Sequence, residues 1–389
     1  MQEDFHYYAT YCAAILAGYS HGESMDICYS AQFVDLCSRT LLSKIKAPVA
    51  AATTQLQLEM MDARTDIVGL QDITRIWASF HFLPKDLYAV KARRPKGYMN
   101  KYRLICGPNG DLVKRTVELA RGKSLPSVGI AMHVLADTWA HSNFAGTPSL
   151  VINNTTNDFY EIFSGPDGDY EKKIKFRHSP SAPDDLDKCL YTNSVYQRNE
   201  NTIMNLGHGR AGHLPDYSFI RYRYLPAWDD YRVMVKDNPS DYFKAFCQMI
   251  YAMKYIRREI QSFETDTYDY EAVSGCEDRI REIIGKRQLL ASDDWKAFGQ
   301  ELSGSEIEDF DLNKYQGPYM DAAKEDKGET FIGQFVEGAM AHKWMVCDQI
   351  YQSGNMLAGF VEGKAMKKAG SQEDMGREAA EKGMGNDEV

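Results

Sequence analysis

Hydrophobic and polar positions follow a helical period along most of this chain. Apolar residues spaced three to four apart place one face of a helix against a core. Gly18 interrupts the first such segment, and Ser20 with Glu23 forms a capping box that starts the next, which runs to about Leu42. The first segment spans residues 5–17, and the remaining helical segments are 111–122, 239–263, 273–287 and 327–352. The pattern predicts a mainly α fold, a multi-helix bundle.

Residues 125–143, LPSVGIAMHVLADTWAHSN, have a different pattern from the amphipathic segments. They contain no Lys, Arg or Glu, and apolar residues occupy nearly every side of the predicted helix. A helix that is hydrophobic all round is normally buried within a bundle. We therefore expect this helix to lie at the centre of the fold.

Residues 48–110 carry the weakest helical signal. The runs TTQLQLEMM and ITRIWASFHFLP alternate between apolar and polar residues, which predicts strands, and KARRPKGYMNKYR after them predicts an exposed loop. We therefore expect a small β-containing insertion in the bundle. Residues 143–235 are rich in Gly, Pro, Asn and Asp, and we expect them to be mostly loops.

The central helix carries one polar stripe. His133, Asp137 and His141 project from it within an arc of roughly 80°. A buried carboxylate needs compensation of its charge, and a divalent metal supplies it. Two alternatives stay open: a hydrogen-bonded His–Asp network, or side chains that cap neighbouring backbone.

Further candidate ligands come from three other places. The segment GHGRAGHLPDYSF brings two imidazoles and a carboxylate within nine residues, and its flexible backbone is typical of the lip of a site, although a surface turn without function is the alternative. His342 has no carboxylate at i±4, and we predict a structural role for it. The candidate metal ligands outside the stripe are His6, Asp35, His81, His208, His213 and Asp216.

The ligand types limit the metal. Eight Cys are dispersed without a C-x-x-C pair, which is typical of reduced core residues and excludes a zinc ribbon or a disulfide framework. His and carboxylate ligands with no thiolate suit zinc first, with Mn2+ or Fe2+ also compatible, and the candidate set is large enough for two or three ions.

Length and charge bound the remaining possibilities. The chain has 389 residues and a net charge of −10, which argues against broad electrostatic binding of nucleic acid. We divide it into a metal-binding helical region at 1–235, a C-terminal helical region at 236–370 and a flexible tail at 371–389. We find no secretory signal and no apolar run of about 20 residues, so we expect a cytoplasmic protein without a transmembrane segment, although signal-independent export stays open.

Several motifs carry a resemblance. The chain resembles a family of uncharacterised bacterial proteins that share D-F-H-Y-Y, A-Q-F-V-D, F-H-F, H-x3-D-x3-H-x2-F and G-H-G-R-A-G-H-L-P-D, all of them between residues 4 and 216 here. The order of its ligands is more remotely similar to the zinc-dependent phospholipase C and P1 nuclease superfamily. That superfamily uses the free amine of an N-terminal Trp, where this chain has Met1, and it has a late H-x3-E/D that this chain lacks.

The remote likeness implies metal-assisted hydrolysis of a phosphate ester, whether lipid, nucleotide or nucleic acid. Asp137 would then bridge two ions, and Arg210 would clamp a phosphate oxygen. Asp4, Tyr7 and Trp139 would orient the ligands or form walls.

Two readings from other classes stay open. The first is an HD-type phosphohydrolase, which the absence of an adjacent His-Asp pair disfavours. The second is a non-catalytic protein in which a metal staples the bundle and the C-terminal helices, with GQFVEGAMAHKWMVCDQIYQSG, bind a protein partner. A metal that cannot be removed without unfolding would favour this second reading.

Overall fold

The computed structural model describes residues 1–177, 183–193 and 205–360, and the predicted tail at 371–389 lies outside them. These residues form a mainly α fold with a small sheet region, as the pattern predicts. Its α-helices are α1 Thr10–Leu16, α2 His21–Leu36, α3 Arg39–Lys44, α4 Gln57–Ala63, α5 Ile67–Phe80, α6 Lys96–Tyr102, α7 Asp111–Ala120, α8 Leu125–Ala140, α9 Leu150–Asn153, α10 Asn238–Ile256, α11 Glu277–Gly285, α12 Ser292–Ser303, α13 Gln316–Asp321 and α14 Phe331–Gln352.

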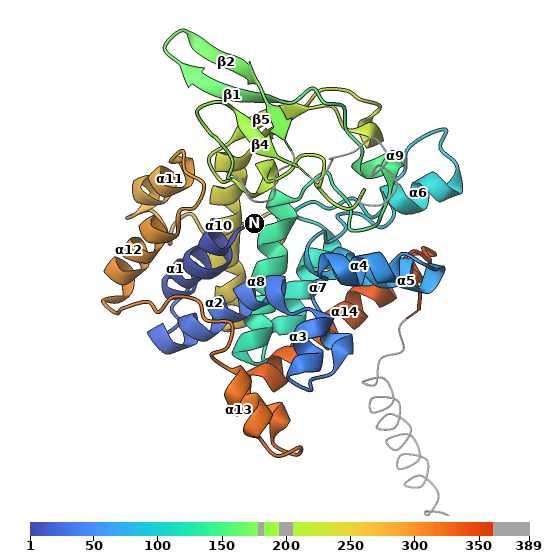
Figure 1. Cartoon of the computed structure of the whole chain (residues 1–389). Helices are drawn as coiled ribbons and strands as arrows, with labels where there is room; N and C mark the ends of the chain where they lie inside the picture. Colours follow the sequence, from blue (N-terminus) through green and yellow to red (C-terminus); the bar gives the residue numbers. More distant parts are fainter. Residues whose placement is uncertain (178–182, 194–204, 361–389) are drawn as a thin grey trace, which may run out of the picture.

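Helix α8 lies at the centre of the fold and packs against α2, α7, α10 and α14 (Figure 1). Its side chains are buried from Val128 to Ala140 on every side, which confirms the central helix expected from its composition. The approach of α2 is especially close, because a Cβ on Gly129 would lie 2.3 Å from the carbonyl oxygen of Ile27. A larger residue there would push the two helices apart.

The first residues of the chain lead into the middle of the bundle. A π-helical turn, η1 Asp4–Ala9, precedes α1, and its side chains are buried from Phe5 onward. Figure 1 places the N-terminus close to α8. The capping box predicted at the start of α2 is present, with Ser20 and Glu23 bonded to each other's backbone N–H.

The predicted strands within 48–110 are wrong, because that region is helical. Asp66 accepts a hydrogen bond from the N–H of Gly69 and so caps the start of α5. Glu59 accepts a bond from the N–H of Leu56 and does the same for α4. The apolar and polar residues alternate over only a few positions here, and the helix caps and the packing of α5 on α14 favour helices instead. Helix α6 also lies in the segment predicted to be an exposed loop.

The β structure lies later in the chain, within the segment predicted to be mostly loops. Four antiparallel strands pair in the order β2-β1-β5-β6, and β3 and β4 form a separate parallel pair. The strands are β1 Tyr160–Gly165, β2 Gly168–Lys173, β3 Lys175–Arg177, β4 Leu190–Thr192, β5 Arg221–Tyr224 and β6 Met234–Asp237. Two acidic residues on β2 bond to two arginines on β5: Asp169 accepts a hydrogen bond from Arg221, and Glu171 forms a paired hydrogen bond with Arg223.

The buried apolar side chains of the described residues form two cores. The larger one includes residues from Met1 to Ala358 and so draws on both predicted regions, 1–235 and 236–370. The smaller one lies under the strands and contains Phe82, Phe144 and Leu214, each near a candidate ligand. The division at 235/236 stays a prediction.

The C-terminal helix α14 buries its apolar face within the chain. Phe335, Ala339 and Val346 are buried, and the helix packs against α5 and α8. The apolar face of α14 is therefore packed within the chain, and binding of a protein partner through the C-terminal helices stays a prediction. None of the described helices is long and apolar enough to cross a membrane.

Candidate metal centre

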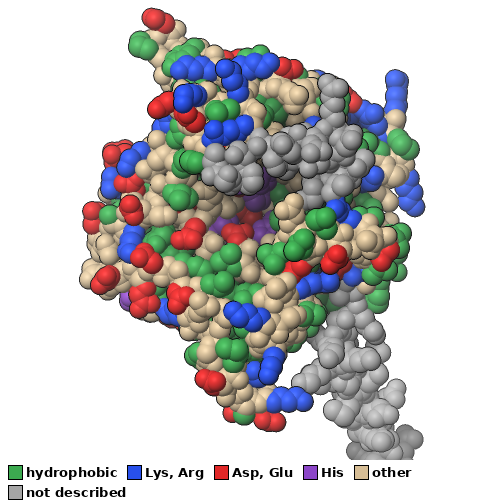
Figure 2. Space-filling view, viewed as in Figure 1, with side chains coloured by type: hydrophobic (Ala, Val, Ile, Leu, Met, Phe, Trp, Pro, Cys, Tyr) green, Lys and Arg blue, Asp and Glu red, His purple; other side chains and the backbone are tan. Residues whose placement is uncertain are grey.

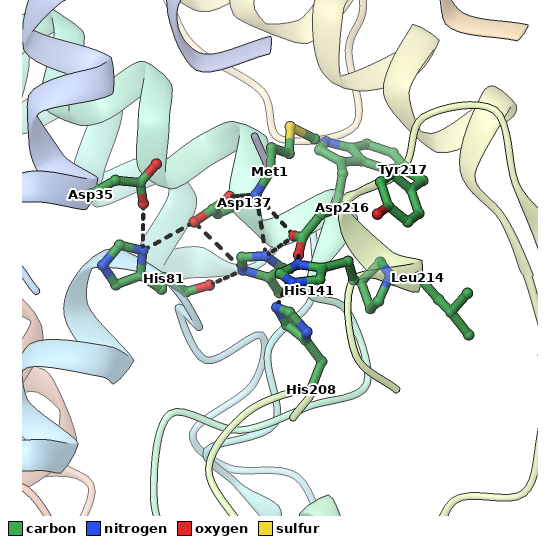
Figure 3. A network of polar contacts seen from close by, with 12 residues as sticks. Met1, Asp35, His81, Asp137, His141, His208, Leu214, Asp216 and Tyr217 are labelled. Atoms are coloured by element: carbon green, nitrogen blue, oxygen red, sulfur yellow. Dashed lines mark hydrogen bonds and ion pairs between the residues drawn. The ribbon is translucent and has the colours of Figure 1, made fainter. Parts of the chain in front are cut away.

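The carboxylate of Asp137 is the centre of a buried cluster of imidazoles (Figure 3). Its Oδ1 lies 3.1 Å from Nε2 of His6, and its Oδ2 lies 3.2 Å from Nε2 of His133 and 3.3 Å from Nδ1 of His81. The two oxygens thus face different nitrogen atoms. A carboxylate in this arrangement can bridge two metal ions.

Each of four imidazoles is fixed by a hydrogen bond from one ring nitrogen to a backbone carbonyl. The pairs are His133 Nδ1 with Ala31 O at 2.9 Å, His81 Nε2 with Thr53 O at 3.0 Å, His141 Nδ1 with His81 O at 2.7 Å and His208 Nδ1 with Gly212 O at 2.8 Å. A carbonyl only accepts, so each of these nitrogens carries the hydrogen. The other nitrogen of each neutral ring keeps a lone pair, the arrangement usual for metal-binding histidines.

Those free nitrogens point at carboxylates. Nε2 of His141 lies 3.0 Å from Oδ1 of Asp216, and Nε2 of His208 lies 3.7 Å from its Oδ2. Asp35 lies near the opening with 29% of its side chain exposed, and its Oδ1 is 3.7 Å from Nδ1 of His81. Three groups of ligand atoms are close enough to hold an ion: His6, His133 and Asp137; Asp35, His81 and His133; and His141, His208 and Asp216.

The α-amino group of Met1 lies between two of these groups. It donates a hydrogen bond to Oδ1 of Asp137 at 2.7 Å and lies 3.3 Å from Oδ1 of Asp216 and 3.2 Å from Nε2 of His141. Burial alone would lower the pKa of this amine, but the carboxylates of Asp137, Asp216 and Asp35 outweigh it and raise the pKa to about 11. The proton on the amine therefore supplies positive charge that a metal ion would replace.

The charged groups of the cluster shift one another's pKa values. Burial works to raise the pKa of Asp137, yet His141, the Met1 amine, His133 and His6 hold it well below the usual range. Burial lowers the pKa of His6 to about 4, with His133 adding to the effect. The pKa of His208 is lowered to about 4 by burial as well. These two imidazoles are therefore neutral at pH 7, the form that binds a metal.

The loop that carries His208 and Asp216 owes its shape to a glycine. Gly212 has a φ of +58°, and a Cβ there would lie 1.9 Å from the carbonyl oxygen of Thr192. Any other residue would be strained and would clash. The carbonyl of this same residue holds Nδ1 of His208. The glycine in the G-H-G-R-A-G-H sequence thus orients a candidate ligand.

Lys236 and Asn238 bond to the backbone around His141 and Asp216, two members of the third ligand group. The buried Lys236 donates hydrogen bonds to Trp139 O at 2.9 Å and Ser142 Oγ at 2.7 Å, on either side of His141. Asn238 donates to the carbonyl oxygens of Leu214 and Tyr217, which flank Asp216, both at 2.8 Å. No sequence pattern pointed to these two residues, because a lysine or asparagine near the end of a strand looks like an ordinary surface residue.

Not every predicted site residue joins the cluster. The imidazole of His213 is 57% exposed, and its Nδ1 lies 3.5 Å from Oδ2 of Asp216. Asp4 accepts a hydrogen bond from the N–H of Ala291, and partial burial raises its pKa to about 6. Arg210 is half-buried in the loop beside His208, with Nε 3.4 Å from Oδ1 of Asn205. Tyr7 and Trp139 bond to Glu308 and Gln248, away from the ligands.

The opening of the centre is visible on the surface. Figure 2 shows a hollow on this face of the molecule, with histidine and acidic side chains at its floor. The nitrogen and oxygen atoms come from η1, α2, α8, the residues that follow α5 and α8, and the 205–217 segment, which are far apart in the sequence. Such convergence of carboxylates and oriented imidazoles defines a mainly α protein with His/Asp groups that can hold metal ions.

Comparison with known proteins adds the family. The model of a family of unknown function, DUF6765, matches residues 1–350, and the chain belongs to this family. No curated protein and no solved structure matches the chain.

Proposed function

We propose that this chain is a metal-dependent hydrolase of phosphate esters, with two or three zinc ions held by the His/Asp cluster. One observation carries the proposal: four imidazoles each spend one nitrogen on a backbone carbonyl and turn the other toward Asp35, Asp137 or Asp216. A merely structural hydrogen-bond network has no need to leave so many lone pairs facing carboxylates.

Charge supports an anionic substrate. Three carboxylates serve the three ligand groups. They cannot neutralise even two divalent ions, so a loaded centre keeps positive charge and attracts a phosphate group. Bound ions would supply a Lewis acid and an activated water for attack at phosphorus. Asp137 would hold two of them at a fixed separation through its two oxygens.

The other residues of the site would act on access and orientation. The half-exposed Asp35 lies at the opening, where a water or substrate oxygen can approach the ligands. Arg210 lies on the loop with His208 and is a candidate to bind a phosphate oxygen of the substrate. The α-amine of Met1, which donates a hydrogen bond to Asp137, would act as a further nitrogen ligand after losing its proton.

The test is metal content by mass spectrometry together with hydrolysis of bis(p-nitrophenyl) phosphate, on protein purified without chelator. We expect two or three ions per chain and hydrolysis that disappears with chelator and returns with Zn2+. The control is His21→Ala, because His21 bonds to Tyr11 away from the cluster. Wild-type protein without bound metal would rule the proposal out.

The same experiment separates the alternative, a non-catalytic protein stapled by metal. If chelator removes the ions while circular dichroism stays unchanged, the metal is not needed for the fold. If the helices unfold with metal loss and no phosphodiester is cleaved, the ions are structural.

A further inference from the structure

The most exposed large apolar side chains of the described residues come from one stretch of the chain. Ranked by exposed fraction, the first five are Val90 at 80%, Leu58 at 74%, Ile67 at 72%, Tyr88 at 66% and Val68 at 61%. They lie on α4, at the start of α5 and in the segment before α6. Single exposed apolar residues are common on any protein surface, but a concentration of them marks a surface that binds something.

Helices α4 and α5 form a short hairpin that is apolar on its outer side as well as its inner side. Met60 and Ile73 are buried on the inner side, as expected of amphipathic helices. Leu58 and Met61, three residues apart on α4, are exposed, and so is Ile67 at the start of α5. The usual polar outer face is therefore replaced here by large apolar side chains.

Helix α6 lies on the same side of the molecule as this hairpin (Figure 1). Residues 355–358 connect the two, because Asn355 donates a hydrogen bond to the carbonyl oxygen of Asn100 in α6 at 2.7 Å. Gln71 and Arg75 of α5 donate hydrogen bonds to carbonyl oxygens of residues 356 and 358, at 3.2 and 2.6 Å. The hairpin and α6 are thus held beside each other by one strip of backbone.

The segment around α6 is the cationic part of this side. Residues 87–110 contain six Lys and Arg and no Asp or Glu: Lys91, Arg93, Arg94, Lys96, Lys101 and Arg103. Lys91 and Arg94 pair with Asp230. Arg93 and Lys96 are exposed, and neither has an ion pair within the part of the chain that the structure describes. Figure 2 shows Lys and Arg side chains projecting from this side of the molecule.

We propose that this side of the molecule, the α4–α6 surface, docks on a membrane that contains anionic phospholipids. We define the α4–α6 surface by its exposed apolar residues and its unpaired cations: Leu58, Ile67, Val68, Tyr88, Val90, Arg93 and Lys96. The apolar side chains would enter the boundary between headgroups and acyl chains, and the two cations would bind lipid phosphates. The combination of the two kinds of side chain matches the two layers of a bilayer surface.

The charge of the whole chain does not oppose this docking. The net charge is −10, but charges more than about 10 Å from the lipid are screened by salt, so the local cations dominate. The hairpin itself carries the exposed Asp62 and Asp66, and its contact with lipid would therefore come from its apolar side chains. No described helix can cross the membrane, so the protein would lie on its surface. This proposal is independent of the metal centre.

The first experiment measures co-sedimentation of the full chain with lipid vesicles. One set is phosphatidylcholine alone, and the other is phosphatidylcholine mixed with phosphatidylglycerol. We expect the mixed vesicles to bind at least about tenfold more tightly, and added salt to remove most of that difference. No binding to the mixed vesicles, or equal binding to both sets, would overturn the proposal.

The apolar part is tested by a double variant, Ile67→Ser/Val68→Ser. We expect binding to the mixed vesicles to fall about tenfold, because two apolar side chains no longer leave water on docking. The matched control is Val233→Ser/Val235→Ser, since these valines are also exposed, at 59% and 53%, but lie at strand β6. An equal loss in the control would show that the contact is not specific to the α4–α6 surface and would refute it.

The cationic part is tested by Arg93→Gln/Lys96→Gln. We expect this variant to lose about tenfold in affinity for the mixed vesicles while its weak binding to phosphatidylcholine stays unchanged. The control is Lys172→Gln/Lys175→Gln, which removes two exposed lysines at β2 and β3. If both variants lose the preference for anionic lipid equally, the attraction comes from the whole molecule and the assignment to α6 is wrong.

A fluorescence measurement distinguishes a membrane from a protein partner. In Ile67→Trp, the emission added to that of wild type should shift to shorter wavelength with the mixed vesicles, because the indole enters the lipid. Val233→Trp should show no such shift. If the α4–α6 surface instead joins two copies of the chain, the shift in Ile67→Trp would follow protein concentration without any lipid, and sedimentation equilibrium would show a dimer. That result would refute the membrane as the partner.

Discussion

Two buried imidazoles differ in their surroundings: His133 on α8 and His342 on α14 each have one ring nitrogen bonded to protein. The other nitrogen of His133, Nε2, lies 3.2 Å from a carboxylate oxygen of Asp137 and 3.9 Å from one of Asp35. The other nitrogen of His342, Nδ1, has no partner among the described residues. The carboxylates beside His133 favour a cation there, whereas burial lowers the pKa of His342 to about 3 and keeps its ring neutral.

We expect the largest effect on metal content from removing the charge of Asp137, the carboxylate that we propose to bridge two ions. Asp137→Asn keeps the shape of the side chain but takes away the charge that His6, His81 and His133 share. We expect bound metal to fall from two or three ions to at most one, held by the His141 group, as measured by metal analysis. The exposed Asp62→Asn should change nothing. A full complement of metal in Asp137→Asn would contradict the bridging role.

The second prediction tests which of the two histidines in the 205–217 segment, His208 or His213, binds a metal ion. His208→Ala should remove one ion, because His208 shares a ligand group with His141 and Asp216. His213→Ala is the matched control five residues later: its imidazole is 57% exposed and should leave the metal content unchanged. Equal loss in both variants would restore His213 as a ligand. Metal analysis and a Co2+ absorption spectrum of each variant measure the effect.

We expect a smaller effect on metal affinity from changing Lys236, which bonds to residues on either side of His141. Lys236→Met removes the hydrogen bonds to Trp139 O and Ser142 Oγ that hold His141 in place, and we expect the affinity for that ion to fall about 10–100-fold. Lys236→Arg should recover part of it.

The single Lys236→Met change also leaves Asp241 without its partner, since their atoms lie 2.6 Å apart. The double variant Lys236→Met/Asp241→Asn removes that unpaired charge. If the double variant binds metal as tightly as wild type, the loss in the single variant came from the charge and Lys236 has no positioning role.

The smallest effect concerns the buried His342 on α14 and depends on pH. The pKa of His342 is lowered to about 3 in the folded state, so between pH 6.5 and pH 3 the unfolded chain binds a proton that the folded chain does not. The free energy of unfolding therefore falls as the pH falls through this window. Compared with His342→Phe, wild type should lose about 2 kcal/mol between pH 6.5 and pH 5, measured by urea unfolding. A constant difference would show that the pKa of His342 is not lowered in the folded state.

Several elements were predictable because their signals are local. The capping box of Ser20 and Glu23, the all-round apolar α8 and the His133-Asp137-His141 stripe each lie within one helix, so periodicity alone predicts them. The strands predicted within 48–110 were wrong because alternation over a few residues fits both a strand and a helix. Caps and packing then decided in favour of α4 and α5.

The sequence by itself determined the mainly helical class, the central helix and the residue types able to bind a metal. Only the tertiary structure decided which of them meet. It brings Asp35 and His81 to His133, leaves His213 at the surface and places the Met1 amine against Asp137. It also shows the backbone carbonyls that orient the imidazoles of His81, His133, His141 and His208. The physical reason is that these contacts join residues tens to hundreds of positions apart, and only the packing of α2, α5, α10 and α14 around α8 sets those distances.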